Sequence, residues 1–579
     1  MDILTRQRGG LALTGAGAGL ALWALDLAAV RGAWPDRVQF GLAALLFTYF
    51  AALLAMAGPV TLRRAAVLAG PVAVVVAGLL SLAALRYETV TAFQMTGLPF
   101  VAAFAVGFLP LPFLIAQGAG GGWRDYPVLF TESWRMVVRA VAAWIFAGLV
   151  WGVVWLSDAL LGIVGLGFIE ALMEAGPLAA MLTGAALGLG SAVVIETAET
   201  AAPDLILRLL RMLALPVLAV TVLFLVALPL RGMSALPAGL SSAGILLAIA
   251  VAGVVLVSAL VDRSDDEAVA GLWMGRVAQA LAAVLPLPVA LAVWALTERV
   301  GQHGWTPGRV FVAVVALAAA GYALLYLLAV LRGAGWRGRI RRANLVMAGV
   351  LVALSALWLT PLLDAEAISA RSQLARYEDG RTEAAALDVA ALGQWGRAGT
   401  AAIARLEELA AEPGHEGLAR RLAGAAAGEA PAMGEAAEAL LAELREVMPL
   451  QPEGATATRD MLLAAIPAVE VQTWIDACTT PLPGGDRPGC VFVVADLWTD
   501  RPGEEAVVLL REPSGFVRYE GLGLGDGGVE RRSVAPVSGL LPDRAAGEQL
   551  IAALQDAPPA VTPAPLNMLK AGGGILLLP

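Results

Sequence analysis

RVFVAVVALAAAGYALLYLLAVLRGAGWRGRIRRANLVMAGVLVALSALW, residues 309–358, contains a pattern that recurs through the first 363 residues of the chain. Two apolar runs of about twenty residues flank a short segment that holds five arginines. A helix of roughly 20 apolar residues crosses the ~30 Å hydrocarbon core of a bilayer, and it satisfies its own backbone polar groups there. The stretch therefore predicts two membrane-spanning helices joined by a basic turn.

Nine further apolar runs precede this pair, so the fold class is an all-α polytopic membrane bundle of about eleven transmembrane helices. The composition agrees, because 59% of the residues are hydrophobic, only 15% are charged and the mean hydropathy is +0.76. The predicted spans cover residues 9–30, 40–60, 65–85, 96–117, 136–157, 177–195, 212–230, 239–261, 277–297, 308–331 and 344–363.

The arginines between the spans are distributed unevenly. We number each gap by the span that it follows. The arginine-rich side consists of the N-terminus and the even-numbered gaps. The arginine-poor side consists of the odd-numbered gaps and the C-terminal region. The arginine-rich side holds sixteen of the twenty-two arginines of residues 1–363. The other six are Arg31, Arg37, Arg86, Arg231, Arg299 and Arg309. Basic residues are retained in the cytoplasm, so we predict a bacterial inner-membrane protein with a cytoplasmic N-terminus and a periplasmic C-terminal region.

Residues 158–176 (DALLGIVGLGFIEALMEAG) bear on the number of crossings. They are moderately apolar but carry three carboxylates, which favours an interfacial helix. A twelfth span is the alternative, and it would change the side on which the C-terminal region lies.

The composition changes after Pro361, where net charge +5 for residues 1–363 gives way to −14 for residues 364–579. We predict a transmembrane helical bundle at 1–363, a helical extramembrane segment at 364–460 and a small α+β extramembrane domain at 461–579. The last domain has a helix near 461–475, apolar runs typical of strands at 491–497, 505–512 and 515–522, and a helix near 544–554. The last fifteen or so residues look loose.

The only two cysteines, Cys478 and Cys490, lie in this last domain. On the periplasmic side they would meet an oxidising compartment, where a disulfide is expected. Two unrelated buried thiols are the alternative. Only two histidines, His303 and His415, exist, and neither lies near the cysteines in sequence, so we expect no metal site.

Four stretches resemble an uncharacterised family of bacterial polytopic membrane proteins, the conserved domain of unknown function 4153. They are DYPVLFTESWR (125–135), RLLRMLALPVLAVTVLFLVALPLRGM (208–233), ERVGQHGWTPGR (298–309) and TPLLDAEAISARSQLARYEDGR (360–381). The resemblance covers roughly residues 80–400, and GWTPGR and SARSQ are its most specific pieces. It implies a bacterial inner-membrane location and about eleven spans, and it supplies no substrate, cofactor or catalytic residue.

Seven residues in or near the ends of the spans are candidate functional groups. In the stretch around QHGWTPGR, a proton-responsive or ligand-contacting cluster could be formed by Glu298, Arg299, His303, Trp305 and Arg309. The alternative is an ordinary re-entry turn with an interfacial tryptophan. Asp26 is an intramembrane carboxylate about one turn from the end of its run. It either lies in the hydrated interface or lines a pathway through the bundle. Asp158 stands at a helix end.

Two packing patterns also stand out. LPLP occurs at 109–112 and at 285–288, in spans four and nine, which run in opposite directions. Paired broken helices of this kind mark binding sites in inverted-repeat transporters, although proline is common in membrane helices. Glycines at GxxxG spacing, which allow close helix contact, occur at 15/19, 148/152 and 184/188.

No motif of catalytic or cofactor-binding chemistry occurs, so we predict neither a cofactor nor a catalytic residue. The acidic tail argues against nucleic-acid binding. Three classes of function remain: a non-catalytic envelope anchoring or assembly protein with a periplasmic partner-binding domain, a small-molecule or ion transporter, and a membrane enzyme acting on lipid or envelope precursors. Because so few charges lie inside the spans, we favour the first, with the lipid bilayer and an envelope protein bound through 364–579 as partners.

Overall fold

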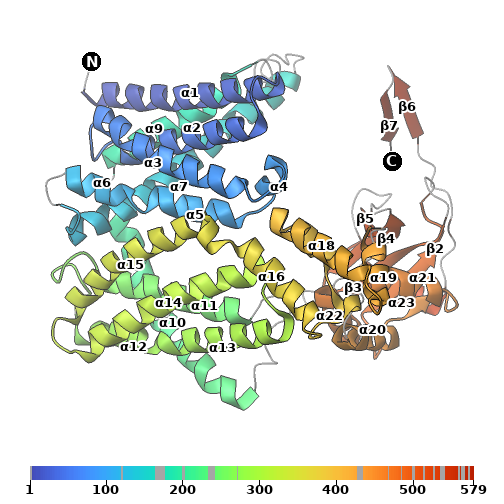
Figure 1. Ribbon diagram of the computed structural model, residues 1–579. Coiled ribbons are helices and arrows are strands. Elements are labelled where there is room, and N and C mark those ends of the chain that lie inside the picture. Colours follow the sequence, from blue (N-terminus) through green and yellow to red (C-terminus); the bar gives the residue numbers. More distant parts are fainter. Residues whose placement is uncertain are drawn as a thin grey trace. The chain divides into compact units, whose positions relative to one another are not determined.

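The computed structural model describes the chain from residue 3 to residue 578 apart from residues 119–121, 164–175, 198–201, 232–241, 270, 427–434, 467, 484, 499–502, 513–514, 526–527, 535–541, 558–560, 562–566 and 572–573 (Figure 1). These residues pack as two compact units. The bundle unit comprises the residues up to 373 together with 394–401, and the C-terminal unit comprises 374–393 with the residues from 402 onward. The two units are described separately below.

The bundle unit confirms the predicted fold class. Eleven helical spans that are long and apolar enough to cross a membrane occur in the described part of the chain. They are formed by α1 (Ile3–Val30), α2 (Asp36–Met56), α3 (Leu62–Ala84), α5 (Leu98–Phe108) with α6 (Leu111–Gly118), α7 (Tyr126–Ile163), α9 (Leu178–Thr197), α10 (Ala202–Arg231), α11 (Ser242–Val261), α12 (Leu272–Val284) with α13 (Pro286–His303), α14 (Pro307–Leu331) and α15 (Trp336–Trp358). A short helix, α4 (Val90–Gln94), lies between α3 and α5.

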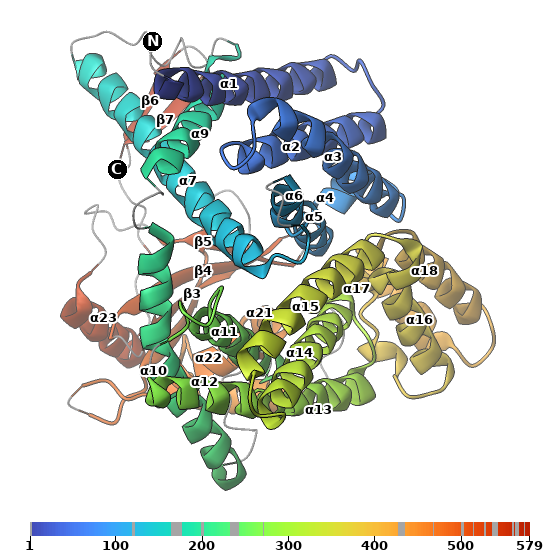
Figure 2. The ribbon, with the colours of Figure 1, turned by 90° about the vertical axis from the view of Figure 1, so that its left-hand side faces the viewer.

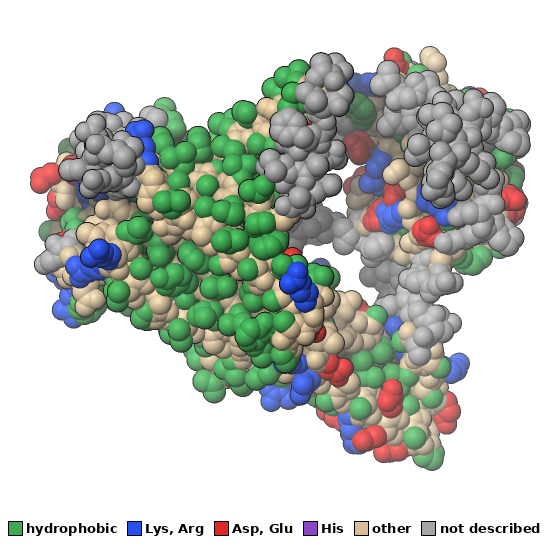
Figure 3. Space-filling view, turned by 90° about the horizontal axis from the view of Figure 1, so that it is seen from above, with side chains coloured by type: hydrophobic (Ala, Val, Ile, Leu, Met, Phe, Trp, Pro, Cys, Tyr) green, Lys and Arg blue, Asp and Glu red, His purple; other side chains and the backbone are tan. Residues whose placement is uncertain are grey.

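The surface of the bundle unit is apolar, as a lipid-facing surface must be. Large hydrophobic side chains such as Val67, Leu149 and Leu223 are exposed on its helices. Figure 3 shows hydrophobic side chains spread over the bundle unit. Exposed apolar area on this scale is exceptional for a soluble protein, and it identifies the surface that contacts the bilayer.

Both LPLP sequences lie at the boundary between two helical segments of one span. Helix α5 ends at Phe108 and α6 begins at Leu111, while α12 ends at Val284 and α13 begins at Pro286. Proline lacks the backbone N–H that would continue the helical ladder, but Leu109 and Leu285 keep helical backbone angles and donate to the Ala105 and Leu281 oxygens, so each span remains one continuous path. Leu111 and Leu285 are buried at these boundaries.

The glycine motifs divide into two groups. Gly15 and Gly19 on α1 face Gly184 and Ala180 on α9, and a Cβ at Gly15 would overlap the carbonyl oxygen of Gly184. Figure 2 shows these two helices side by side. A Cβ at Gly148 or Gly152 would instead meet nothing within 4 Å. The spacings 15/19 and 184/188 therefore belong to one close backbone contact between α1 and α9, whereas the spacing 148/152 makes no such contact.

The C-terminal unit is the predicted combination of helices and a small sheet. Its five-stranded sheet has the order β1-β2-β3-β4-β5, with β1 parallel to β2 and the other pairs antiparallel. The strands are β1 (Leu450–Gln451), β2 (Cys490–Ala495), β3 (Glu505–Arg511), β4 (Val517–Gly525) and β5 (Gly528–Ser533). The helices from the end of the bundle onward are α16 (Ala365–Glu378), α17 (Val389–Gly393), α18 (Gly396–Ala410), α19 (Glu416–Ala426), α20 (Glu435–Val447), α21 (Thr456–Ala464), α22 (Ala468–Thr479) and α23 (Arg544–Asp556).

The sheet is covered on both faces, which explains why its central strands read as continuous apolar runs. Phe492 and Val494 of β2 pack into a core with the fully buried Trp474 of α22. The alternate residues Val491 and Val493 pack into a second core with Ile551 of α23. Side chains of one strand thus fill two cores, as the period of two requires.

The predicted disulfide is present. Cys478 of α22 and Cys490 of β2 are joined, with their Cα atoms 4.8 Å apart, and both residues are buried in the core shared with Trp474. The bridge therefore fastens a helix to the strand that it covers.

Some predictions met a different outcome. The C-terminal residues were expected to be loose, but β6 (Asn567–Ala571) and β7 (Gly574–Leu578) pair as an antiparallel hairpin. Most of the 158–176 segment, at 164–175, lies outside the described residues. The domain boundaries after residues 363 and 460 remain predictions.

Candidate functional site

The two most specific pieces of the resemblance, GWTPGR and SARSQ, contact one another. Ser372 Oγ accepts a hydrogen bond from the Trp305 backbone N–H at 3.1 Å. The side-chain amide of Gln373 donates to the backbone oxygens of His303, at 3.0 Å, and Trp305, at 2.9 Å. The SARSQ segment of α16 therefore holds the turn between α13 and α14 in place.

Local chemistry explains the shape of this turn. Gly304 ends α13 with φ +73°, a conformation that favours glycine. Thr306 caps α14, since its hydroxyl accepts from the Arg309 N–H at 3.4 Å, and Pro307 occupies the first helical position. The Arg309 guanidinium donates to the backbone oxygens of Gly304, at 2.7 Å, and His303, at 3.3 Å.

A buried charged cluster lies at the neighbouring helix ends. The Arg86 guanidinium donates to the backbone oxygens of Trp358, at 2.8 Å, and Thr360, at 2.6 Å, just past α15. It also lies 3.5 Å from carboxylate oxygens of Asp364 and Glu366. Tyr87 donates its hydroxyl to Glu366 at 3.0 Å. We call residues 86–88, 303–309 and 358–373 the collar.

Burial dominates the electrostatics of the collar. The Glu366 side chain is only 7% exposed, and its removal from water raises the pKa of its carboxyl above the ordinary value, although Arg86 and Tyr87 oppose the shift. Burial also raises the pKa of the Tyr87 hydroxyl, with the Glu366 charge acting in the same direction. Tyr87 therefore stays a neutral donor at physiological pH.

A later segment of the chain returns to the collar. Gly396 has φ +58°, and a Cβ there would lie 2.6 Å from the Arg86 carbonyl oxygen. The next residue, Arg397, donates its backbone N–H to that same oxygen at 2.8 Å. Only glycine fits this approach without displacing the Arg86 backbone.

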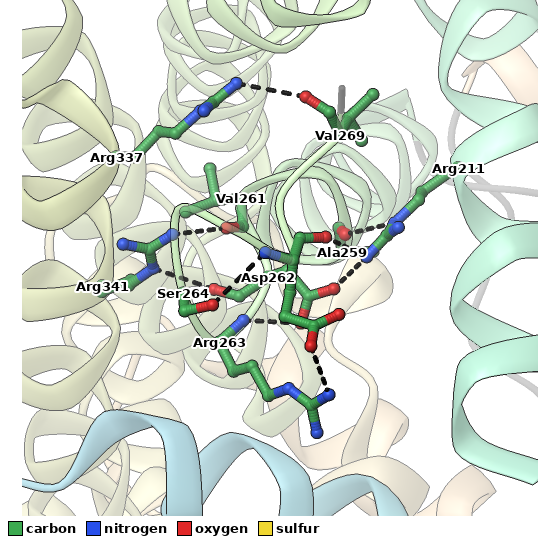
Figure 4. A network of polar contacts seen from close by, with 10 residues as sticks. Arg211, Ala259, Val261, Asp262, Arg263, Ser264, Val269, Arg337 and Arg341 are labelled. Atoms are coloured by element: carbon green, nitrogen blue, oxygen red, sulfur yellow. Dashed lines mark hydrogen bonds and ion pairs between the residues drawn. The ribbon is translucent and has the colours of Figure 1, made fainter. Parts of the chain in front are cut away.

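On the arginine-rich side a second network joins three helices. Figure 4 shows the guanidinium groups of Arg211, from α10, and Arg341, from α15, reaching Asp262 at the end of α11. Arg211 also donates to the Ala259 oxygen at 3.0 Å, and Arg341 to the Val261 oxygen at 2.8 Å. These are the unsatisfied carbonyls at a helix C-terminus, where a positive charge is favourable.

Capping of helix C-termini by arginine recurs through the bundle unit. On the arginine-rich side, Arg139 donates to the Ala57 oxygen after α2, Arg64 to the Gly118 oxygen of α6 and Arg339 to the Gly333 oxygen after α14. On the arginine-poor side, Arg37 donates to the Ala84 and Tyr87 oxygens at the end of α3. Arg86 donates to the Trp358 oxygen at the end of α15, and Arg309 donates to the Gly304 oxygen after α13. Three of the six arginines that depart from the charge asymmetry therefore cap helix ends.

Some of these contacts join two gaps. Arg341 links gap ten to gap eight. On the other side Arg37 links gap one to gap three through the Glu88 oxygen. Each of these contacts joins gaps assigned to the same side.

The structure does not draw the predicted candidate residues into one cluster. Glu298, Arg299 and His303 are exposed on α13, and the described hydrogen bonds of the turn use the His303 backbone oxygen. Asp26 is exposed near the end of α1 and Asp158 is half-buried in α7. In the turn at QHGWTPGR the Trp305 backbone and the Arg309 side chain make the contacts that fix the backbone, and both interpretations of this stretch remain predictions.

Sequence reasoning missed the groups that carry the most contacts. Arg86 was counted only as an exception to the charge asymmetry, and Glu366 was quoted only within a longer stretch. The available signal was their position at span ends, where helices expose unsatisfied carbonyls. No group of three or more His, Cys, Asp or Glu side chains placed to hold a metal ion is found among the described residues.

Eleven apolar spans with polar contacts at their ends define an integral, polytopic α-helical membrane protein. The chain belongs to the family described as Domain of unknown function (DUF4153), whose model matches residues 41–406. The match includes all four stretches of the resemblance and reaches from within α2 into α18. No curated protein and no solved structure matches the chain.

Proposed function

We propose that the protein is a non-catalytic anchoring and assembly protein of the bacterial inner membrane. In this proposal residues 1–363 form the anchor, residues 364–460 a helical segment and residues 461–579 a periplasmic domain that binds an envelope protein. The observation that carries the proposal is the placement of ionisable groups. In the described bundle unit the buried charged residues Asp262 and Glu366 lie outside the spans, while Glu132 and Arg139 lie in the first half of α7. Arg139, Asp262 and Glu366 have partners at helix ends. Pumps and transporters that relay protons keep such groups within their pathways.

Two observations support the orientation. The arginine-rich side holds sixteen of the twenty-two arginines of residues 1–363. Of the six arginines on the other side, Arg37, Arg86 and Arg309 cap helix ends. The disulfide lies in the C-terminal unit, and such bonds persist in oxidising compartments such as the periplasm.

Reporter fusions test the orientation. A reporter joined after Arg342 should be active in the cytoplasm, and one joined after Arg381 should be active in the periplasm, because span eleven lies between them. An alkaline-phosphatase and green-fluorescent-protein pair at each site measures both sides independently. The same side at both positions would refute the proposed topology.

Neutral substitution of exposed carboxylates tests the anchor role. Asp26→Asn and Glu298→Gln should each restore a deletion strain to the level of the unchanged protein, because neither group is proposed to move a proton or a substrate. Growth and envelope integrity are measured at matched protein levels, with an empty vector as the zero. If either variant behaves like the empty vector, the anchor role is wrong.

A transporter is the second candidate, and the paired LPLP sequences are the observation that favours it. The LPLP sequences lie in spans four and nine, which are five spans apart and, under the proposed topology, run in opposite directions. An inverted repeat requires this relation. Loss of function in Asp26→Asn would move the proposal toward transport.

A further inference from the structure

Below the collar the bundle unit contains an apolar cavity of about 410 Å³. It lies between α5, α11, α14 and α15, and its lining side chains are apolar except Tyr322 and Ser355, with Trp358 at one end. Its volume falls within the roughly 300–1,000 Å³ of ordinary ligand pockets.

The cavity occupies the depth of one leaflet. Its lining on α14 runs from Phe311, near the start of the helix on the arginine-poor side, to Tyr322 in the middle of the span. Eleven residues of helix cover about 16 Å, which is half of the ~30 Å hydrocarbon core. On α15 the lining reaches Trp358, the last residue of that helix, at the level of the collar.

One donor at the collar end of the cavity lacks an acceptor. Trp358 is 3% exposed, and its indole Nε1 is buried with no hydrogen-bond partner among the described residues. Its ring packs edge-on against Phe311, 5.8 Å between centroids. Buried donors are nearly always paired, so an acceptor brought to this nitrogen by a ligand would be stabilising.

The charged groups nearby do not call for a charged ligand inside the cavity. Arg86 is already engaged by two backbone oxygens and two carboxylates, and Glu366 by Tyr87 and Arg86. The lining itself carries no charge. An occupant must therefore be apolar over its length and offer one neutral acceptor at the level of Trp358.

We propose that the cavity binds one acyl chain of a bilayer glycerophospholipid, whose ester carbonyl accepts the Trp358 indole N–H. The bilayer supplies this molecule at the required depth, with the chain directed to the midplane and the ester at the interface. The headgroup lies outside the cavity, at the collar. This site does not depend on the proposed anchor role.

Photolabelling of the full-length protein tests the site. The protein is reconstituted in vesicles of phosphatidylethanolamine and phosphatidylglycerol with a trace of phosphatidylcholine that carries a diazirine at mid-chain. Adducts are located by mass spectrometry. Labelling is expected on the cavity-lining residues of α14, including Ala319, which is 6% exposed and screened from bulk lipid.

Two variants and a control make the result decisive. Ala319→Phe fills the cavity and should reduce adducts on its lining at least tenfold, whereas Leu317→Phe, at a position 62% exposed on the same helix, should leave them unchanged. Trp358→Phe keeps the ring and removes the donor, and should reduce the adducts about fivefold, the effect of one hydrogen bond. Labelling restricted to exposed residues in the unchanged protein, or equal labelling of the cavity in the unchanged protein and Trp358→Phe, would overturn the proposal.

Discussion

Replacing Arg86 with methionine should lower the free energy of unfolding of the bundle unit by about 3–5 kcal/mol. The Arg86 side chain is 9% exposed and is the cationic partner of Asp364 and Glu366. Its loss leaves these carboxylates without their ion pair and two carbonyls beyond α15 without donors. Unfolding in mixed detergent micelles, followed by circular dichroism, measures the change.

Arg299→Met provides the matched control. This arginine belongs to the same side of the bundle but is exposed, so its replacement should change the unfolding free energy by no more than about 0.5 kcal/mol. Equal losses for the two variants would mean that the buried cluster contributes nothing specific.

The loss in Arg86→Met should also depend on pH. Burial raises the pKa of Glu366, and Arg86 is one of the groups that lower it, so removing Arg86 raises the pKa further. A carboxyl with a raised pKa binds its proton more tightly in the folded state, and stability falls as pH rises from the ordinary value through the folded value. The variant should therefore lose more stability at pH 8 than at pH 5. Adding Glu366→Gln should remove this slope.

Removing the disulfide by Cys478→Ala and Cys490→Ala together should destabilise the C-terminal unit by about 2–4 kcal/mol. The bond closes a loop with a sequence separation of 12 and ties α22 to β2 inside a buried core. Alanine avoids burying the hydroxyl that serine would bring. Hydrogen–deuterium exchange of β2 and β3 in the full-length protein measures the loss of protection.

Reduction supplies the control for this variant. Reductant should bring the unchanged protein to the exchange rates of the double variant and should leave the double variant itself unaffected. Exchange in the spans of the bundle unit should not change. Undiminished protection of β2 in the double variant would show that packing alone holds the helix to the sheet.

The spans could be predicted from sequence because the bilayer imposes their length and polarity. The run predicted at 308–331 is α14 at Pro307–Leu331, and the run at 65–85 is α3 at Leu62–Ala84. The disulfide was also within reach, since the chain has only two cysteines and both fall in the C-terminal region. In each case a local pattern or a count of residues was enough.

The collar was out of reach for the opposite reason. Arg86 and Glu366 are 280 positions apart, and neither has a local pattern that indicates its partner. The outer strand β5, with the sequence GVERRS, was missed because it lacks the alternation of apolar residues that marks a strand. Charges on an edge strand discourage pairing with other chains, so the feature that protects the sheet also concealed the strand.

The contact between α1 and α9 has a consequence for assembly during synthesis. Gly184 leaves the ribosome about 170 residues after Gly15, which at roughly 5–20 residues per second is on the order of 10–30 s. Throughout that interval the glycine face of α1 has no partner from α9. The glycine face of α1 is therefore open to contact with other helices until α9 enters the bilayer.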